Sequence, residues 1–472
     1  MKRGQIAVIG GGITGLSAAH GLLPWAREQQ VAVTLFESQS RLGGVIQTVE
    51  LAGVPIEAGP DSLLTRKPDA LNLIRSLGLG DQLLGLNPGA HGAYIFHRNR
   101  LHPIPAGLVA GVPAEMDGLW RTGLLSWFAK ARALGDLFLP AAQPEDDMAL
   151  GRLLRYRFGN QVVDRIATPI LSGIYAGDID ALSLQATAPQ VAAWARQNKS
   201  LMRAAREAAR GRQPARPPAP SLFMTVRSGL GRVVESLADS LSPVAVRLNT
   251  PIRRVEPMRS GGFRLQTAAG DRERFDAVIL STPAWAAAPL LDFSVEVQNR
   301  LMAVPYTDLA LVLAVYRPQD ISLPLDKTGF LVPPGEGVAM TAATWVRSKW
   351  DYPTAVPWVP IRTFYGRASA PVNLNLSDAD MLQSFQQDLA RVMGVRRDPV
   401  EARVIRIPAG MPQYLVGHIA RIQELRERLK SWPGLYLAGA AYEGVGIPDC
   451  VRQGQSAAKA LMADWTRPGV PG

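Results

Sequence analysis

A glycine-rich run near the start of the chain has the spacing of a turn that binds a pyrophosphate. It fits the pattern G-x-G-x-x-G and consists of Gly10, Gly11, Gly12, Ile13, Thr14 and Gly15. Glycines at these positions allow a tight turn, a close approach of the backbone to phosphate oxygens, and close packing of the following helix. Glu37 comes 22 residues after Gly15, where its carboxylate can accept hydrogen bonds from both hydroxyls of a ribose. Together these features predict a dinucleotide site.

Three further glycine-containing segments favour a flavin over a nicotinamide dinucleotide. Arg41 is followed by Leu42, Gly43 and Gly44, and the two glycines leave the backbone accessible to a ligand. Gly59 to Ser62 forms a second glycine-containing bend. Far along the chain, Gly439 to Ile447 closes the last predicted strand and opens the last predicted helix. A helix N-terminus can meet the negative charge that develops near N1 and the C2 carbonyl of a reduced flavin. A nicotinamide dehydrogenase has little need for a C-terminal segment that comes back to the dinucleotide site. We therefore predict FAD as the cofactor.

The residues around the first glycine run predict the elements that position it. Apolar runs at Gln5 to Ile9 and at Val31 to Phe36 read as strands, and a helix begins between them in the glycine run. Pro24 should end or kink that helix, because proline lacks the amide hydrogen of the helical ladder. The order is a βαβ unit, with Glu37 directly after its second strand.

The rest of the chain alternates between a helical region and strands. Residues 106–190 read mostly as helix, and strand-like runs then suggest a second, mixed sheet. These runs are at residues 245–248, 263–267, 277–281, 310–316, 329–332 and 404–407. A short apolar strand, Leu435 to Ala438, and a helix from Pro448 to Trp465 end the pattern.

The net charge of +11 is concentrated in one stretch of the chain. Residues 196–232 hold nine Lys or Arg and one acid, Glu207, which gives nine minus one, or +8. No DNA-reading helix, zinc spacing or aromatic-basic RNA motif accompanies this charge, so nucleic acid is not a predicted partner. A solvated helix at 192–212, followed by a Pro-rich tether at 213–220, is the favoured interpretation; anionic lipid and an acidic substrate stay open.

The cysteine content fits a reducing compartment, and the hydropathy argues against a membrane-spanning segment. The chain has a single cysteine, Cys450, which excludes an intramolecular disulfide and a cysteine-based metal cluster. A small buried filler is the favoured role for it. No uninterrupted run of eighteen apolar residues and no leader with a cleavage site is present. We therefore expect a cytoplasmic protein that is neither exported nor membrane-spanning.

Three segments resemble motifs of the protoporphyrinogen oxidase family, a member of the flavoprotein group that also holds amine oxidases and phytoene desaturases. Ser172 to Asp178 resembles S-G-V-Y-A-G-D, and Pro412 to His418 resembles P-Q-Y-x-x-G-H. Tyr442 to Cys450 is similar to the family's C-terminal run that ends in D-C. The likeness covers nearly the whole chain in order.

This resemblance implies an α/β protein in three parts. A Rossmann-like FAD-binding domain would be assembled from residues 1–86, 222–290 and 430–472. A helical domain at 106–200 would associate with membranes. A substrate-binding domain on a mixed sheet would comprise residues 87–105, 201–221 and 291–429.

The resemblance also implies site residues. Besides the glycine run, Glu37 and Arg41 with Gly44, the FAD would be contacted by Ser38, Val45, Gly59, Pro60, Asp61, Ser62, Ile252, Gly439, Val445, Gly446 and Ile447. The substrate would approach the backbone of Gly173 and lie between Leu331 and Phe364. Core packing is an equally good explanation of Leu331 and Phe364 from the sequence alone. No residue is assigned a catalytic proton transfer or a metal.

The expected function is the oxidation of protoporphyrinogen IX to protoporphyrin IX in haem biosynthesis, with dioxygen as acceptor. Coproporphyrinogen III is the alternative substrate. Ala93 stands where many family members have an arginine that can pair with a propionate, and His91, Arg98 and Arg100 lie nearby. An amine oxidase, a carotenoid desaturase and a non-catalytic flavin-binding protein are more distant alternatives. The sequence leaves open a homodimer and peripheral contact of the helical region with the inner face of the membrane.

Overall fold

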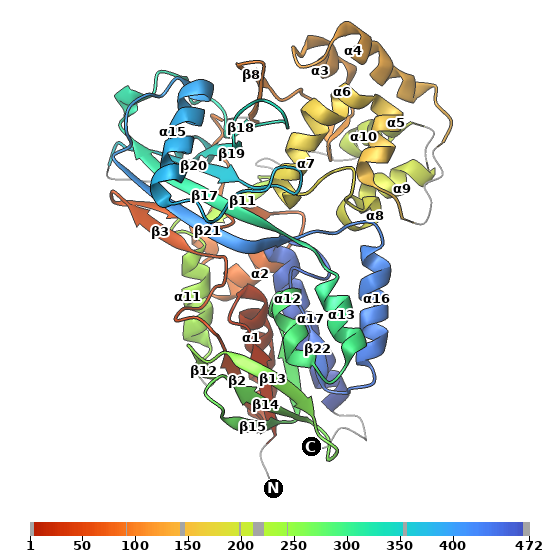
Figure 1. The fold of residues 1–472 in the computed structure, drawn as a ribbon, viewed down its shortest axis with the longest axis vertical. Coiled ribbons are helices and arrows are strands. Elements are labelled where there is room, and N and C mark those ends of the chain that lie inside the picture. Colours follow the sequence, from red (N-terminus) through yellow and green to blue (C-terminus); the bar gives the residue numbers. More distant parts are fainter. Residues whose placement is uncertain are drawn as a thin grey trace.

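A five-stranded parallel sheet forms the centre of one half of the molecule (Figure 1). Its order is β12-β2-β1-β16-β22, and every neighbouring pair is parallel. Ile6, Ala7 and Val8 of β1 are fully buried, because helices and a small sheet cover both faces. The strands are β1 Gln5–Ile9, β2 Ala32–Phe36, β12 Ala245–Arg247, β16 Ala277–Leu280 and β22 Leu435–Leu437. The structure is a computed structural model that describes residues 4–90, 92–141, 147–197, 200–210, 221–242, 244–352 and 356–465.

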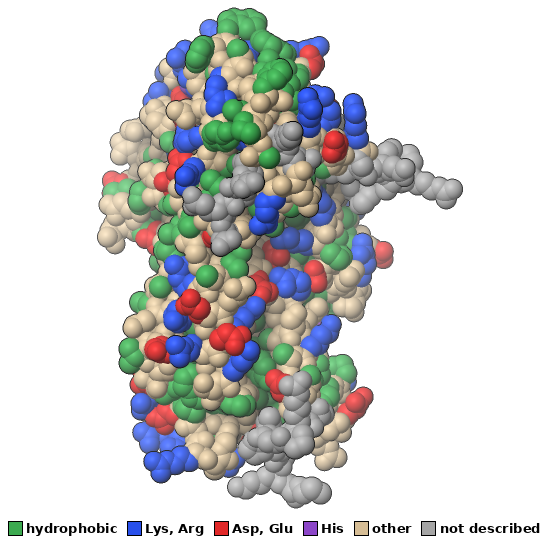
Figure 2. Space-filling view, turned by 90° about the vertical axis from the view of Figure 1, so that its right-hand side faces the viewer, with side chains coloured by type: hydrophobic (Ala, Val, Ile, Leu, Met, Phe, Trp, Pro, Cys, Tyr) green, Lys and Arg blue, Asp and Glu red, His purple; other side chains and the backbone are tan. Residues whose placement is uncertain are grey.

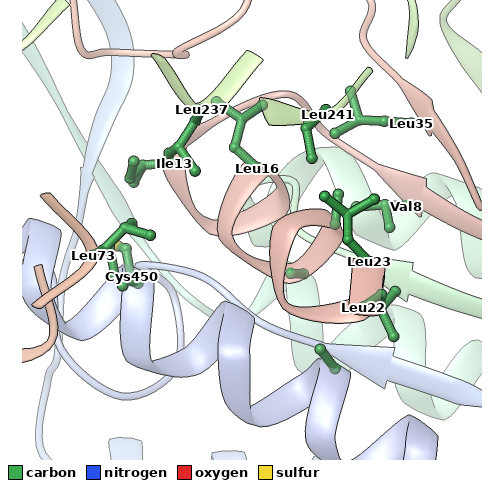
Figure 3. Packing of buried hydrophobic residues seen from close by; sticks show 14 of the residues in the cluster. Val8, Ile13, Leu16, Leu22, Leu23, Leu35, Leu73, Leu237, Leu241 and Cys450 are labelled. Carbon is green, nitrogen blue, oxygen red and sulfur yellow. The ribbon is translucent and has the colours of Figure 1, made fainter. Parts of the chain in front are cut away.

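Two long helices from opposite ends of the chain pack side by side on this sheet. They are α1 Ile13–Glu28 and α17 Ile447–Trp465. A Cβ at Gly454 would lie 2.2 Å from the carbonyl oxygen of Thr14, so the two backbones touch there. Figure 3 shows Leu16 and Leu22 of α1 among apolar side chains from neighbouring elements, with Cys450 of α17 nearby. Cys450 is buried, as predicted for a filler.

Helix α1 runs through Pro24 to Glu28. The expectation that the helix ends near Pro24 is therefore wrong. Leu22, Leu23 and Ala26 on either side of the proline are buried in the core, and this packing holds the last turn in place.

Smaller elements surround the parallel sheet. A three-stranded antiparallel sheet covers one side: β13 Ile252–Pro257, β14 Phe263–Thr267 and β15 Arg272–Phe275. Another joins β5 Leu63–Leu64, β11 Phe223–Val226 and β6 Leu83–Gly85. The helices here are α2 Asp69–Ser76, α11 Gly231–Ser240, α12 Ala284–Ala287, α13 Val295–Met302 and α16 His418–Leu429.

The second half contains a seven-stranded mixed sheet, as expected. Its order is β21-β17-β20-β19-β18-β7-β8, and only the β7–β18 pair is parallel. Helix α15 Asp378–Met393 covers one face, and the hairpin of β3 Thr48–Leu51 and β4 Val54–Glu57 packs on the other. The strands are β7 Tyr94–His97, β8 Arg100–Pro103, β17 Tyr306–Tyr316, β18 Gly329–Leu331, β19 Met340–Trp345, β20 Val359–Tyr365 and β21 Glu401–Pro412, with α14 Val346–Lys349 between β19 and β20.

A helical unit with its own apolar core lies beside the mixed sheet (Figure 1). It comprises a short hairpin, β9 Leu108–Val109 and β10 Val112–Pro113, with α3 Met116–Arg121, α4 Trp127–Leu134, α5 Leu150–Phe158, α6 Asn160–Val162, α7 Thr168–Tyr175, α8 Leu184–Thr187, α9 Pro189–Gln197 and α10 Leu201–Arg210. Leu201 and Met202 of α10 are buried in this core, although the sequence assigned residues 201–221 to the substrate-binding part. The predicted tether at 213–220 lies outside the described residues.

The predicted α/β class, with a mixed sheet and a helical region, is confirmed. In the part of the chain that the structure describes, no helix is both long and apolar enough to cross a bilayer.

Candidate flavin and substrate site

The glycine run leads from β1 into α1 with its backbone open to a ligand. Gly10 has φ +109, and a Cβ at Gly15 would lie 2.0 Å from the Gly10 carbonyl oxygen, so both positions require glycine. A Cβ at Gly12 would meet nothing within 4 Å. No side chain caps the N-terminus of α1. The free amide groups and positive end of the helix dipole fit a pyrophosphate.

Glu37 is held at the edge of this turn. Its Oε2 accepts a hydrogen bond from the Gly11 amide at 2.7 Å, and its Oε1 accepts one from the Gln39 amide at 2.8 Å. The carbonyl of Glu37 accepts the amide of Thr250, which precedes β13 and Ile252. The sequence therefore predicted a carboxylate that the fold does bring to the glycine run.

The segment after Glu37 lies against the same turn. The Gly43 amide donates to the Gly11 carbonyl at 2.8 Å. Arg41 donates to the carbonyls of Leu42, Gly44 and Ile46. The guanidinium thus holds the backbone of its own loop in place beside the glycine turn.

The bend at Gly59 joins this loop. A Cβ at Gly59 would lie 1.9 Å from the carbonyl oxygen of Val45, so the two backbones are in contact. Val45 is 51% exposed, which is unusual for an apolar side chain between buried segments. The arrangement brings the predicted contacts at 41–45 and 59–62 next to each other.

Tyr414 binds the loop that opens α17. Its hydroxyl donates to the Ala440 carbonyl at 2.6 Å and accepts the Gly444 amide at 2.7 Å. The ring of His418 stacks on Tyr414 at 3.9 Å, and His418 Nε2 lies 3.1 Å from the Tyr442 carbonyl. Burial lowers the pKa of His418, so the ring is neutral near pH 7.

Gln413, next to Tyr414, connects a third motif. Its Nε2 donates to the Tyr175 carbonyl at 2.9 Å, at the end of α7. The three segments that resemble family motifs, 172–178, 412–418 and 442–450, are therefore one hydrogen-bonded assembly. The sequence pattern gave no reason for their contact, because Gln413 and Tyr175 are 238 residues apart.

The parallel sheet brings two helix N-termini together. Because β1 and β22 are parallel members of one sheet, the helices that follow them, α1 and α17, both begin at its C-terminal edge. Gly439, which follows β22, has φ +143 and lies beside Ser281, whose hydroxyl donates to the Gly10 carbonyl at 2.9 Å. Two positive helix ends at one edge can bind two negatively charged parts of one cofactor.

Three cations that the sequence analysis did not single out, Lys349, Arg362 and Lys67, pair with carboxylates at this edge. Asp61 pairs with Lys349 at 2.9 Å and with Arg362 at 2.7 Å. Burial alone would raise the pKa of Asp61, but the two cations hold it well below its usual value. Lys67 binds both oxygens of Asp449, in the first turn of α17, at 2.7 and 2.8 Å. In the sequence, the one feature that could have indicated this group of charges is Arg362, a charged residue inside the mostly apolar strand β20.

The mixed sheet presents a short accessible row of side chains. Leu331, Ala342 and Phe364 are directly opposite one another on β18, β19 and β20, so they share one face. All three are partly exposed, while Ile95 and Leu311, which continue the row on either side, are buried. The row is therefore open only in its middle.

The open middle of the row, here called the slot, is two strand spacings wide at the backbone. Leu331 and Phe364 are two strand spacings apart, about 10 Å, and only the methyl group of Ala342 stands between them. A planar ring with contacts on both faces needs about 7 to 8 Å. A Cβ on Gly173 would lie 3.6 Å from Leu331 Cδ2, so α7 borders the slot. The structure thus brings Gly173, Leu331 and Phe364 together.

Arg98 and Arg100, two of the side chains considered for propionates, are exposed at the β7–β8 hairpin. Arg98 is in the β7–β8 turn with φ +52, its side chain is exposed, and its amide donates to Glu336. Arg100 is likewise exposed, and His91 lies outside the described residues.

Known proteins resemble the chain along nearly its whole length. Residues 13–462 match the model of a family described as flavin containing amine oxidoreductase. A Bacillus subtilis (strain 168) protein named coproporphyrinogen III oxidase is 37% identical over 460 residues, which cover 96% of this chain and 97% of that protein. An Arabidopsis thaliana protein named protoporphyrinogen oxidase 1, chloroplastic, is 26% identical over 94% of this chain and 85% of its own length.

A solved structure shares the fold. It comes from Exiguobacterium sp. 255-15 and is provisionally described as a protoporphyrinogen oxidase. The TM-score is 0.88 with 34% sequence identity, and the superposition covers 98% of this chain and 100% of that one.

Proposed function

The chain belongs to the flavin-containing amine oxidoreductase family, and from that membership we propose that it oxidises coproporphyrinogen III to coproporphyrin III. It is a flavin-dependent oxidoreductase of the porphyrinogen oxidase kind, and its cofactor is FAD. The observation that carries the choice of substrate is the 37% identity, over 97% of its length, to a protein named coproporphyrinogen III oxidase. The protoporphyrinogen oxidase from Arabidopsis is less similar, at 26%. Coproporphyrinogen thus replaces protoporphyrinogen as the preferred substrate.

The residues at the C-terminal edge of the parallel sheet fit FAD. The open backbone at Gly12 and the uncapped start of α1 would hold the pyrophosphate, and Glu37 would accept the ribose hydroxyls. The start of α17, at Val445 to Ile447, would face the ring. When bound, FAD supplies the two-electron acceptor of the reaction.

The slot would hold the macrocycle. Leu331 and Phe364 would contact its two faces, and the exposed backbone of Gly173 would let its edge approach closely. The chain would exclude water from the methylene bridge and fix its position, since orientation is a large part of such catalysis. The pyrrole nitrogens of the substrate supply the electron push and lose a proton, so no protein base is required. Dioxygen is the proposed final acceptor, reduced to hydrogen peroxide in each of three rounds.

The test is to supply each porphyrinogen under air to the flavin-loaded protein. We expect porphyrin fluorescence and peroxide from both, with the higher kcat/KM for coproporphyrinogen III. Phe364→Ala should lower kcat/KM about two- to twelvefold, because a ring contact contributes roughly 0.5 to 1.5 kcal/mol. Equal loss of flavin and of thermal stability in this variant would instead identify Phe364 as a core residue. Oxidation of neither porphyrinogen, with flavin reduction by an amine or a carotenoid precursor, would disprove the proposal.

We also propose that one end of the helical unit contacts the inner face of the cytoplasmic membrane. Four aromatic side chains, here called the aromatic face, are strongly exposed: Trp120 by 40%, Trp127 by 72%, Phe128 by 82% and Phe138 by 86%. Figure 2 shows hydrophobic side chains interspersed with Lys and Arg at the end of the molecule where α3 and α4 lie. Aromatic and basic side chains together suit a lipid interface.

Not every apolar side chain of this region supports the contact. Leu124 and Leu125, which lie between α3 and α4, are 0% and 6% exposed and belong to the helical core. Trp127 and Phe128 do not pack inward. Core packing therefore explains the leucines and leaves the aromatic face without a role in the fold.

A further inference from the structure

Arg367 is a buried cation without a counter-charge. The residue is 4% exposed, and no carboxylate of the described residues pairs with it. Its Nη1 donates to the Val332 carbonyl at 2.9 Å, and its Nε has no hydrogen-bond partner among the described atoms. Burial lowers the pKa of the guanidinium, and no opposite charge offsets this effect. A buried charge is costly unless an anion compensates it.

The other buried arginines are compensated. Among the described residues, the arginines classed as buried are Arg157, Arg362 and Arg367. Arg157 lies 3.5 Å from Asp136, and Arg362 lies 2.7 Å from Asp61. The fold thus supplies a carboxylate wherever it buries a guanidinium for structural reasons. Arg367 departs from this pattern, which suggests that its anion comes from outside the chain.

The position of Arg367 links it to the slot. Arg367 follows β20, the strand that holds Phe364. Its Nη1 donates to the carbonyl of Val332, which comes directly after Leu331, the last residue of β18. Both strands are antiparallel to β19 and so end on the same side of the sheet. The Ala368 amide donates to the Ala176 carbonyl at 2.8 Å, which ties this end to the segment after Gly173. The guanidinium therefore lies at one end of the slot.

The orientation of the guanidinium leaves one edge without a hydrogen bond among the described residues. With Nη1 on the Val332 carbonyl, Nε and Nη2 form the remaining edge, and no hydrogen bond from either is found among the described residues. Two parallel donors on one edge of a guanidinium match the two oxygens of a carboxylate. A vinyl or methyl substituent would leave the buried donors unpaired.

We propose that Arg367 binds a carboxylate of the substrate at this end of the slot. The inference rests on the proposed function, because coproporphyrinogen III carries four propionates at its rim. Arg367 would pair with a substrate carboxylate, which Ala93 cannot do. Arg98 and Arg100 are too exposed for this role. The residue would set specificity without taking part in the electron transfer.

The test pairs a ligand change with a residue change. Coproporphyrin III and its tetramethyl ester are titrated, in the same detergent, into flavin-loaded wild type and Arg367→Gln. Wild type should prefer the free acid, and Arg367→Gln should reduce that preference about tenfold to a hundredfold. In turnover, KM for coproporphyrinogen III should rise by a similar factor while kcat changes little, since the contact is made in ground and transition states alike.

Arg391→Gln is the matched control. Arg391 lies on α15 and is exposed. It donates to the Gly337 carbonyl, on the loop that follows β18, and to the side chain of Asn99, in the β7–β8 turn. Its loss removes one positive charge from the same end of the sheet without touching the slot. An unchanged preference for acid over ester in this control excludes a general effect of charge; the same fall as in Arg367→Gln would overturn the proposal.

The outcomes separate this inference from the function beneath it. If wild type oxidises coproporphyrinogen III and Arg367→Gln retains its KM and its preference, Arg367 merely supports Val332 and only this inference fails. If wild type oxidises no porphyrinogen, the proposed function fails, and the substrate carboxylate is lost with it. If Arg367→Gln loses its flavin, Arg367→Lys is the deciding variant. Lysine keeps the charge but lacks the planar edge of the guanidinium, so KM for coproporphyrinogen III should rise severalfold. An unchanged KM in this variant refutes the proposal.

Discussion

Glu57 ends β4 at the place where the hairpin meets the start of α11. The residue is 4% exposed, and its carboxyl accepts the Leu230 amide at 2.7 Å and the Thr48 hydroxyl at 3.1 Å. Burial disfavours the charged form and raises the pKa of Glu57 to about 7, against the lowering effect of the Leu230 amide and of Arg362. The folded protein therefore binds this proton more tightly than the unfolded chain does.

Glu57 should make the protein less stable as the pH rises. Its contribution is complete below the ordinary value of 4.5 and is lost as the pH rises through about 7. The free energy of unfolding of wild type, relative to Glu57→Gln, should fall by up to about 3 kcal/mol between pH 5 and pH 8. Urea unfolding of both proteins at each pH measures this difference. The comparison removes the opposite contributions of His418, His20 and His102, whose pKa values burial lowers, and a difference that stays constant with pH would contradict the assignment.

Local rules of sequence predict some site residues and miss others. Gly10 to Gly15 and Glu37 follow from backbone requirements over a few residues, and the structure brings them together. Asp61 and Lys349 are 288 residues apart, and Arg367 is notable only for a partner that it lacks. No local pattern encodes such pairings or absences, because they depend on which strands become neighbours.

At the scale of elements, Tyr414 fixes the loop that opens α17. Its hydroxyl satisfies two partly buried backbone groups, the Ala440 carbonyl and the Gly444 amide. Its neighbour Gln413 binds the end of α7. A change at the helical unit can therefore reach the start of α17 through two adjacent side chains.

Tyr414→Phe should destabilise the flavin-loaded protein by about 1 to 3 kcal/mol, because it leaves both backbone groups unpaired. Flavin should dissociate more readily, since the loop is a proposed flavin contact. Thermal unfolding and the flavin released on dilution measure the two effects.

Tyr442→Phe is the control for this substitution. Tyr442 belongs to the same loop and is equally buried, but its hydroxyl has no hydrogen-bond partner among the described residues. Removing that hydroxyl should change little. Equal losses in the two variants would show that ring packing, and not the hydrogen bonds of Tyr414, stabilises the loop.

Strands were easier to predict than their partners. The bounds of β1 and β14 agree with the runs expected from the sequence, because alternating or continuous apolar residues are a local signal. The same signal does not tell that β12 and β16 join the parallel sheet while β14 lies in a separate one. The course of α1 through Pro24 was missed for a similar reason, since tertiary packing outweighed local preference.

At the scale of the whole molecule, the aromatic face lies on the helical unit, in the half of the structure opposite to the termini of the described chain (Figure 1). The rings of Trp120 and Trp127 are 5.8 Å apart, and Lys130 Nζ is 4.6 Å from the centre of the Trp127 ring. Exposed apolar side chains gathered in this way commonly mark an interaction surface.

Trp127→Ser should weaken binding to liposomes that contain anionic lipid by about tenfold to a hundredfold, since burial of a large apolar side chain contributes roughly 1.5 to 3 kcal/mol. Flotation with and without anionic lipid measures this binding. Trp285→Ser is the control, because Trp285 is 46% exposed on α12, in the other half of the molecule. Absence of flotation by wild type in both lipids would reject the membrane contact.

The arrangement of the five-stranded sheet also sets the order of events during synthesis. The flavin turn is made before the helical unit and most of the mixed sheet, yet α1 completes its packing only against α17, which follows them in the chain. The edge strand β22 and the loop held by Tyr414 likewise come from the end of the chain. A nascent chain therefore carries an unfinished cofactor domain while the mixed sheet and the helical unit are being made, and we expect flavin loading to follow the synthesis of α17.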